Sequence, residues 1–341
     1  MTTERNIAIA VTGFGSIGRR ITEMLLDRRE AYRQRYGIEA RIVGVCGSSA
    51  GLVDPSGLEP ERLYARESFV AGLTGEAFLG GVKADVLVEA SPSDYVTGGP
   101  ALHYLRGALG RGMHAIAVSK GALVVDLRGL LRLAGAHGGS LRMSAAAASG
   151  LPTVDFLQHS LAGCRVLSFE AVLTGTANLV LEEMMNGLPF ADALALAQDR
   201  GIAEPDPSFD VEGWDTAAKL VIIANAALGA DLRLDALPRE GIGRIGPDDV
   251  ARWRAEGRSP RLVGFLEYDG ESPADDDGFR AGVELRTYGQ DHPFAHLRGS
   301  MKGFSAVTDE MGVLTVVGGA SDPRATAAAA LKDFEHILAE C

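Results

Sequence analysis

The chain has 341 residues and a formal net charge of −12 at pH 7, with 46% hydrophobic and 23% charged residues. This length accommodates two domains with separate cores, and the composition is typical of a folded protein without long disordered segments. The acidic charge argues against nucleic acid as a partner, because binding to a phosphate backbone depends on clustered Lys and Arg.

The cysteines and the length of the apolar runs indicate in which cellular compartment the protein is expected. Cys46, Cys164 and Cys341 are odd in number, widely spaced and outside any Cys/His ligand pattern, so we expect neither a disulfide framework nor a zinc site. No run of about 18 uncharged apolar residues is present, and no signal peptide precedes residue 7. We therefore expect a cytoplasmic protein without a membrane partner.

The first part of the chain alternates short apolar runs with helical patterns. Residues 7–11 predict a strand, a glycine-rich turn follows, and residues 17–36 predict one helix. Further strands are expected at 41–46, 85–89, 114–118 and 141–145. This order predicts an α/β fold with a Rossmann-type, doubly wound parallel sheet in a nucleotide-binding domain over residues 1–150.

The pattern changes after Gly150 and predicts a second, α+β domain over residues 151–319. We expect helices at 152–161, 175–186 and 190–200, and a strand at 166–173. Strand-like runs within 260–318 predict an antiparallel sheet, with 271–278 as a loop. In the last helix, within 320–341, Asp322 is expected as N-cap and Pro323 as the first helical residue. This helix is expected to complete the first domain.

The glycine-rich turn has the G-x-G-x-x-G spacing of a dinucleotide site. Between a strand and a long helix, such glycines permit a tight turn and close approach to a pyrophosphate, although a purely structural turn is the alternative. The predicted cofactor-binding residues are Gly13, Phe14, Gly15, Ser16, Ile17, Gly18, Ser48, Ser91 and Lys120.

The end of the second predicted strand bears on the choice of nucleotide. Gly47, Ser48 and Ser49 stand where an NAD site usually carries a carboxylate for the ribose 2′-hydroxyl. A 2′-phosphate would therefore not be repelled. The sequence favours NADP and leaves NAD open, with Arg19 and Arg66 as candidate partners of the phosphate.

Two lysines and an aspartate are the candidate catalytic groups. Asp215 and Lys219 stand four residues apart, so a helix presents them on one face; a surface ion pair is the alternative. Lys120 follows a predicted strand at the sheet edge where open α/β folds bind ligands. Its alternative role is helix capping or a solvent-facing position.

Two further segments leave alternatives open. Thr174, Gly175, Thr176 and Asn178 precede an apolar helix and suit either capping of its N-terminus or binding of a substrate carboxylate. The small residues of SAAAASGLP suit either close packing or a monovalent cation near Ala147, Ser149 and Leu151.

These motifs resemble the homoserine dehydrogenase family over nearly the whole chain. The segment AEPDPSFDVEGWDTAAKL matches the family pattern at almost every defining position and is the most specific of the matches. The remaining matches are GFGSIG, SKGAL, GTANLVLEEM, DHPFAHLRG and VVGGASDPRATAAAALKDF.

The resemblance implies reversible NAD(P)H-dependent reduction of aspartate 4-semialdehyde to homoserine. Lys120 and Lys219 correspond to two lysines near the reacting oxygen, and Asp215 to the acid beside them. Glu204 corresponds to the carboxylate that holds the substrate ammonium. With Asp210, Gly175, Thr176 and Asn178, it makes up the predicted substrate-binding set. A homodimer is expected.

The chain departs from the family pattern at Ser119, Ser144, Leu179 and Lys302, which affects the cation site and the fit of the substrate. A related NADP-dependent reductase of another short amino or hydroxy aldehyde is therefore an alternative. A catalytically silent nucleotide-binding sensor is another, and the presence of all four polar residues argues against it. The family's regulatory domain is not expected after the last helix, nor is allosteric control by threonine.

Overall fold

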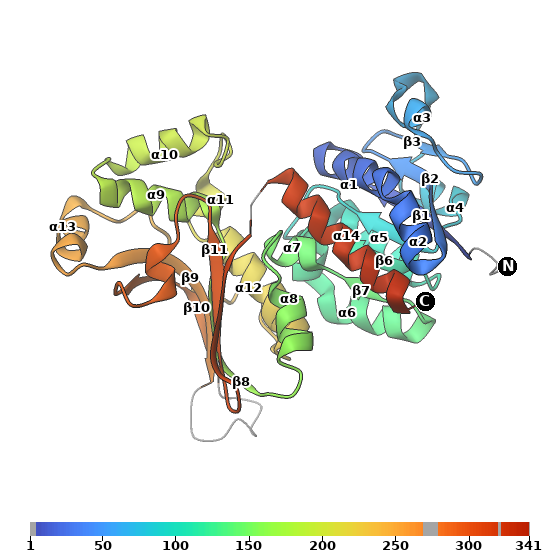
Figure 1. Cartoon of the computed structure of the whole chain (residues 1–341). Helices are drawn as coiled ribbons and strands as arrows, with labels where there is room; N and C mark the ends of the chain where they lie inside the picture. The colour runs from blue at the N-terminus through green and yellow to red at the C-terminus, as the bar shows by residue number, and fades with distance from the viewer. Residues whose placement is uncertain (1–4, 269–278, 320–321, 341) are drawn as a thin grey trace. The chain divides into compact units, whose positions relative to one another are not determined.

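A computed structural model describes residues 5–268, 279–319 and 322–340 of the chain. The fold divides into two compact units (Figure 1). The first unit contains Met1–Gly150 and Asp322–Cys341, and the second contains Leu151–Ser321. The predicted loop at 271–278 and Cys341 lie outside the described residues.

The first unit is built on a seven-stranded sheet in the order β4-β3-β2-β1-β5-β6-β7. Strands β1, β2, β5, β6 and β7 are parallel, as predicted, whereas β3 pairs antiparallel with β2 and the edge strand β4 pairs antiparallel with β3. The bounds are β1 Arg5–Thr12, β2 Ile38–Cys46, β3 Ala50–Val53, β4 Val70–Ala71, β5 Val86–Glu89, β6 His114–Ala117 and β7 Leu141–Arg142.

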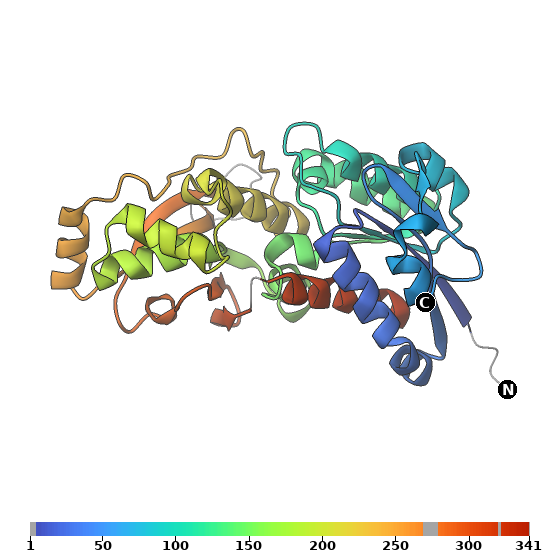
Figure 2. The ribbon, with the colours of Figure 1, turned by 90° about the horizontal axis from the view of Figure 1, so that it is seen from above.

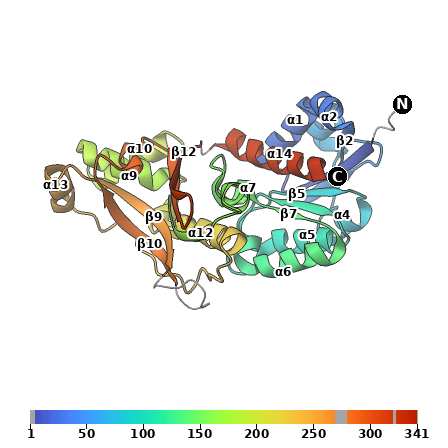
Figure 3. The same cartoon turned by 60° about the horizontal axis from the view of Figure 1, so that its bottom comes forward.

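Helices cover both faces of this sheet (Figure 3). Helices α1 Ser16–Asp27, α2 Arg29–Tyr36 and α14 Pro323–Glu340 lie on one face, and α4 Gly75–Gly81, α5 Gly99–Leu109 and α6 Gly121–His137 lie on the other. The shorter helices are α3 Pro60–Tyr64, η1 Arg66–Ser68 and α7 Ser144–Ala148. This two-faced cover confirms the doubly wound α/β class.

Helix α14 lies beside α1 in the first unit (Figures 1 and 2). Its Leu331 and Phe334 are buried in the core together with Ile21 and Leu25 of α1. The Phe334 and Tyr32 rings meet edge to face, 5.4 Å apart. The predicted cap is confirmed, because the Asp322 carboxylate accepts a hydrogen bond from the Ala325 N–H at 2.8 Å.

Two predicted elements of this unit differ from the structure. The helix predicted over 17–36 is divided at Arg28, whose φ of −100° and ψ of 3° are not helical. The strand predicted over 141–145 ends after Arg142, and α7 begins at Ser144. The Ser144 N–H donates to the Asp333 carboxylate of α14 at 2.9 Å. This backbone group is therefore bonded to α14 and does not continue the pairing of β7 with β6.

The second unit contains a five-stranded antiparallel sheet in the order β10-β9-β8-β11-β12. Its strands are β8 Val166–Val172, β9 Ser259–Tyr268, β10 Phe279–Tyr288, β11 Lys302–Thr308 and β12 Gly312–Gly318. Its helices are α8 Thr153–Asp155, the π-helical turn η2 Phe156–Ser160, α9 Gly175–Asn186, α10 Phe190–Asp199, α11 Ser208–Val211, α12 Trp214–Ala227, α13 Pro247–Ala255 and η3 Pro293–His296.

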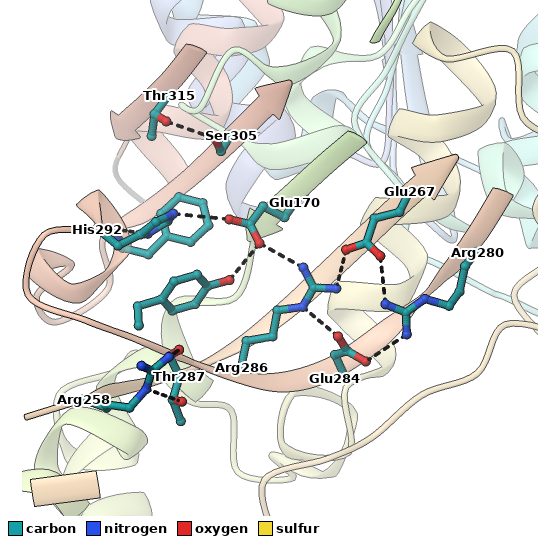
Figure 4. Close-up of polar contacts among 12 residues, drawn as sticks. Glu170, Arg258, Glu267, Arg280, Glu284, Arg286, Thr287, His292, Ser305 and Thr315 are labelled. Carbon is teal, nitrogen blue, oxygen red and sulfur yellow. Dashed lines mark hydrogen bonds and ion pairs between the residues drawn. The ribbon is translucent and has the colours of Figure 1, made fainter. Parts of the chain in front are cut away.

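The two faces of this second sheet are different in character. A Cβ built on Gly264 would lie 3.2 Å from Thr216, so α12 packs closely on that face. Successive residues of a strand point to opposite faces of the sheet, so Glu267 lies on the face opposite to Gly264. That opposite face carries a group of ion pairs (Figure 4). Arg286 is bonded there to Glu170, Glu267 and Glu284 at 2.6–3.0 Å, which links β8, β9 and β10.

Over the described ranges, no helix combines the length and apolar character needed to span a bilayer. Cys46 is buried, and Cys164 is partly exposed.

Candidate active site

A cavity of about 670 Å³ lies in the first unit, beyond the carboxyl ends of β1, β2 and β5. Seven of the predicted cofactor residues line it, namely Gly13, Phe14, Gly15, Ser16, Ile17, Ser48 and Ser91. Arg19, Gly47, Ser49, Ala50, Leu63, Tyr64, Arg66, Phe69, Ala90 and Pro92 complete the lining. The glycine-rich motif does not predict that Tyr64 and Phe69 line the cavity, because they lie between β3 and β4, well after the motif in the sequence.

The three glycines of the turn have different roles. Gly13 has a φ of 76°, and a Cβ on it would lie 2.2 Å from the Ala90 backbone. A Cβ on Gly18 would lie 2.4 Å from the Gly13 carbonyl oxygen, so this glycine serves helix packing. No heavy atom lies within 4 Å of a Cβ on Gly15, where the backbone is open to the cavity at the start of α1. This cradle fits a pyrophosphate at a helix N-terminus.

The end of β2 offers the cavity no acidic group. Gly47, Ser48 and Ser49 line it there, together with Arg19 and Arg66, and the described lining contains no Asp or Glu. The Arg19 guanidinium lies 4.7 Å from the centroid of the Phe14 ring, and Phe14 stacks on Phe69 at 5.9 Å. This part of the cavity is therefore aromatic and basic.

In the second unit, α12 brings Asp215 and Lys219 together as the spacing predicts. The Lys219 Nζ lies 2.6 Å from the Asp215 Oδ2, and the two side chains are only 14% and 10% exposed. The surface ion-pair alternative is therefore wrong. The same Nζ donates to the Leu173 carbonyl oxygen at 2.9 Å. A carboxylate and a carbonyl hold the ammonium in one orientation.

Side-chain capping, one of the two roles weighed for the residues at the start of α9, does not occur at its N-cap residue Thr174. The Thr174 hydroxyl donates to Asp215 at 3.2 Å and lies 2.8 Å from the Thr216 hydroxyl. No side chain caps α9, since these partners from α12 take the hydroxyl that a cap would use. Thr174 instead joins the beginning of α9 to the Asp215–Lys219 pair.

Asn178 and Thr176 are buried in the first turns of α9. The Thr176 hydroxyl donates to the Ile202 carbonyl at 3.1 Å, and the Asn178 Nδ2 donates to the Gly299 carbonyl at 2.8 Å. The Asn178 Oδ1 has no hydrogen-bond partner among the described atoms. A buried acceptor of this kind can receive a donor from a ligand.

The acidic segment before α12 is less enclosed. Glu204 is exposed, and no ion pair among the described residues joins it to Lys219. Asp210 is partly exposed in α11. The structure thus places Thr174, Asp215 and Lys219 together and leaves the Glu204 carboxylate facing solvent.

Lys120 belongs to the first unit, where it stands immediately before α6. Its side chain makes no capping bond, and its N–H donates to the Ser93 hydroxyl at 2.9 Å. Lys120 is thus the N-cap residue of α6 by position, without a capping bond from its side chain. Its position after β6 places it at the carboxyl edge of the sheet.

The segment predicted as a cation site lies around α7. Ala147 is buried, Ser149 has a φ of 56°, and its hydroxyl lies 2.9 Å from the Thr326 hydroxyl. Near the start of α7, the Lys332 Nζ donates to the Ser144 hydroxyl at 2.6 Å. Burial lowers the pKa of Lys332. Leu151 belongs to the second unit, and the cation site stays a prediction.

Glu89 is a buried carboxylate that sequence reasoning did not select. It ends β5 and is 0% exposed, beside the cavity-lining Ser91. Burial raises its pKa, while hydrogen bonds from Ser119 and Ser91 act in the opposite direction. The sequence does indicate this residue, because Glu89 is the single charged residue at the end of the apolar strand VLVE.

Family models and related proteins match both units. The model described as "Homoserine dehydrogenase" matches residues 152–334, and "Homoserine dehydrogenase, NAD binding domain" matches residues 13–144. An NAD(+)-dependent homoserine dehydrogenase from Pseudomonas canavaninivorans is 32% identical over 340 residues, covering 96% of this chain and 95% of the relative. A homoserine dehydrogenase from Methanocaldococcus jannaschii is 31% identical, covering 96% and 98%.

A crystal structure of a putative homoserine dehydrogenase from Archaeoglobus fulgidus has the same fold, with a TM-score of 0.86 and 31% identity. The likeness covers 97% of this chain and 99% of that one. The family models match both units, and the cavity of the first unit fits a nicotinamide nucleotide. The chain therefore belongs to the homoserine dehydrogenase family and is an NAD(P)-dependent oxidoreductase acting on a CH–OH group.

Proposed function

We propose that this protein reversibly reduces aspartate 4-semialdehyde to homoserine. The observation that carries the proposal is the buried Asp215–Lys219 pair. An ammonium group has three N–H donors, and Asp215 and Leu173 engage two of them. The third can donate to a substrate oxygen.

The nicotinamide ring, when bound, supplies the hydride to the aldehyde or accepts it from the alcohol. As negative charge develops on the substrate oxygen, the Lys219 ammonium stabilises and protonates it. Asp215 orients the amine through their 2.6 Å contact. Lys120 is assigned to the same oxygen by the family resemblance.

The amino-acid end of the substrate is assigned to the residues around α9 and the acidic segment. We assign the substrate ammonium to Glu204 and Asp210. The substrate carboxylate is assigned to the N-terminal turn of α9, at Gly175, Thr176 and Asn178, where helix N–H groups favour an anion. The Asn178 Oδ1, which has no partner among the described atoms, can accept a further hydrogen bond from the same substrate ammonium.

We further propose that NADP(H) is used at least as well as NAD(H). The acid-free lining at Gly47–Ser49 and the presence of Arg19 and Arg66 support this preference, although one relative is named as NAD(+)-dependent. A monovalent cation near Ala147, Ser149 and Leu151, and a homodimer, belong to the same proposal.

The test is a nicotinamide absorbance assay with homoserine or aspartate 4-semialdehyde and with each nucleotide in turn. Turnover of homoserine with either nucleotide is expected, and a simple alcohol without the amino group serves as the control. An enzyme that oxidised the simple alcohol but ignored homoserine would instead be a reductase of another short aldehyde. Nucleotide binding without turnover of any substrate would indicate a sensor.

A further inference from the structure

Three carboxylates are buried in the described part of the chain, and Glu89 differs from the other two. Asp215 forms an ion pair with Lys219, and Asp333 forms one with Lys332. Glu89 is 0% exposed, yet no Lys, Arg or His within the described ranges forms an ion pair with it. Burying a carboxylate without a counter-charge costs free energy of folding, and the hydrogen bonds that the carboxylate accepts offset this cost.

Its hydrogen bonds reach the loops that follow two neighbouring strands. One carboxylate oxygen accepts from the Ser91 N–H at 2.6 Å, and the other accepts from the Ser119 hydroxyl at 2.5 Å. Ser91 lines the nucleotide cavity after β5, whereas Ser119 follows β6 and immediately precedes Lys120. The Glu89 side chain thus connects Ser91, in the wall of the cavity, to the loop that carries Ser119 and Lys120.

The same two loops are in close contact further along. The Lys120 N–H donates to the Ser93 hydroxyl at 2.9 Å. A Cβ on Gly121 would lie 2.3 Å from the Asp94 carbonyl oxygen, and one on Gly13 would lie 2.3 Å from the Ser91 nitrogen. Neither loop can shift without breaking a bond or meeting backbone atoms. Glu89 therefore belongs to a set of contacts that hold Ser91 and Lys120 in place.

We propose that Glu89 is a positioning residue that fixes Ser91 against the nucleotide and Lys120 against the reacting oxygen. The Lys120 half of this role rests on the proposed function. The Ser91 half concerns nucleotide binding alone and is measurable without turnover. The two halves can therefore be tested separately.

The experiment compares Glu89→Ala with Glu89→Gln. The alanine variant removes both bonds and is expected to lower kcat at saturating substrate at least tenfold and to weaken NADPH binding, measured by nucleotide fluorescence, at least fivefold. Glutamine can accept from the Ser91 N–H and donate to the Ser119 hydroxyl. It is therefore expected to restore both quantities to within about threefold of the wild type, because it keeps both hydrogen bonds.

Asp85→Ala is the matched control. Asp85 stands just before the other end of β5, and its carboxylate accepts from the Ala8 N–H at 2.7 Å. This variant loses a similar tie at the amino edge of the sheet. It is expected to lower the melting temperature while kcat and the Kd for NADPH stay unchanged. A Glu89→Ala variant that behaved in the same way would overturn the proposal.

Ser119→Ala covers the case in which Glu89→Ala fails to fold. It removes only the bond on the lysine side, so kcat should fall while the Kd for NADPH stays within twofold. Equal losses in both quantities, or no loss in either, would contradict the assignment. If Lys120→Ala keeps full turnover, the role proposed for Lys120 is wrong, whereas the NADPH result for Glu89→Ala still decides the Ser91 half.

Discussion

The Lys219 side chain combines two properties that catalysis at an oxygen requires. Its charge is compensated by Asp215, and its direction is fixed by the Leu173 carbonyl. Thr174, next to Leu173, also reaches Asp215, so α12 and the β8–α9 connection together fix one ammonium group. An exposed lysine would lose its orientation to rotamer freedom.

Replacement of Lys219 by alanine is expected to lower kcat by about 100-fold or more, because the group that stabilises and protonates the oxygen is lost. Lys120→Ala is expected to have an effect of the same order. Steady-state kinetics with homoserine, with circular dichroism to verify folding, measure both. Lys83→Ala is the control, since this exposed lysine lies outside the cavity. Near-normal turnover in either variant would remove that lysine from the mechanism.

Glu204→Gln is expected to raise the KM for homoserine much more than the KM for the nucleotide. A charge-assisted hydrogen bond to the substrate ammonium is lost, at a cost of about 1.5–3 kcal/mol. The same kinetic assay measures both constants, and Glu256→Gln serves as the exposed control. An effect confined to the nucleotide constant would assign Glu204 to a different role.

Gly47→Asp is expected to shift cofactor preference toward NAD(H). The new carboxylate can bond a ribose 2′-hydroxyl and repel a 2′-phosphate. The site accommodates a side chain, because the nearest atom to a Cβ on Gly47 is the Ala50 oxygen at 3.9 Å. The ratio of kcat/KM for the two nucleotides measures the shift, and Gly47→Ala separates charge from backbone effects. A strong native preference for NAD(H) would contradict our interpretation of this strand end.

Local spacing predicted the Asp215–Lys219 pair because both residues lie on one helix, where the helical period fixes their distance. The partner of Thr174 could not be predicted in this way, since Asp215 lies 41 residues further along the chain. Glu89 was missed for the same reason. Its burial depends on β1 and β6, which flank β5 through parallel pairing.

At the scale of elements, the strands of the parallel sheet were predicted from their apolar runs, including β5 and β6 with four residues each, whereas β3 and β4 were not. β1, β2 and α9 have enough apolar residues to define a period. β3 and β4, with four and two residues, do not. The division of the helix at Arg28 was not predicted either, because no Pro or Gly marks the break.

The ion network of the second sheet is expected to contribute to its stability. Arg286→Ala leaves three carboxylates from three strands without their shared cation, and we expect the free energy of unfolding to fall by about 2 kcal/mol. Urea unfolding measures this change. Arg233→Ala removes an exposed pair with Asp235 and should cost less than about 0.5 kcal/mol. Equal effects of the two variants would show that the network adds nothing to a surface pair.

At the scale of the whole molecule, the chain forms the first unit from both of its ends. Phe334→Ala in α14 is therefore expected to destabilise the nucleotide unit by about 3–5 kcal/mol, since it removes a buried ring from the core that α1 shares. Thermal unfolding with and without NADPH measures the loss. Arg324→Ala, exposed in the same helix, should change little. A Phe334→Ala variant as stable as the wild type would show that α14 is dispensable to this core.

The return of α14 also sets an order of events during translation. Residues 1–150 emerge from the ribosome with the surface that α14 covers still exposed, and roughly 170 residues of the second unit must be synthesised before that helix appears. At about 5–20 residues per second, the interval is roughly 10–30 s. During that time the second unit, which is continuous in sequence, can complete its fold, while the nascent first unit exposes apolar side chains to chaperones.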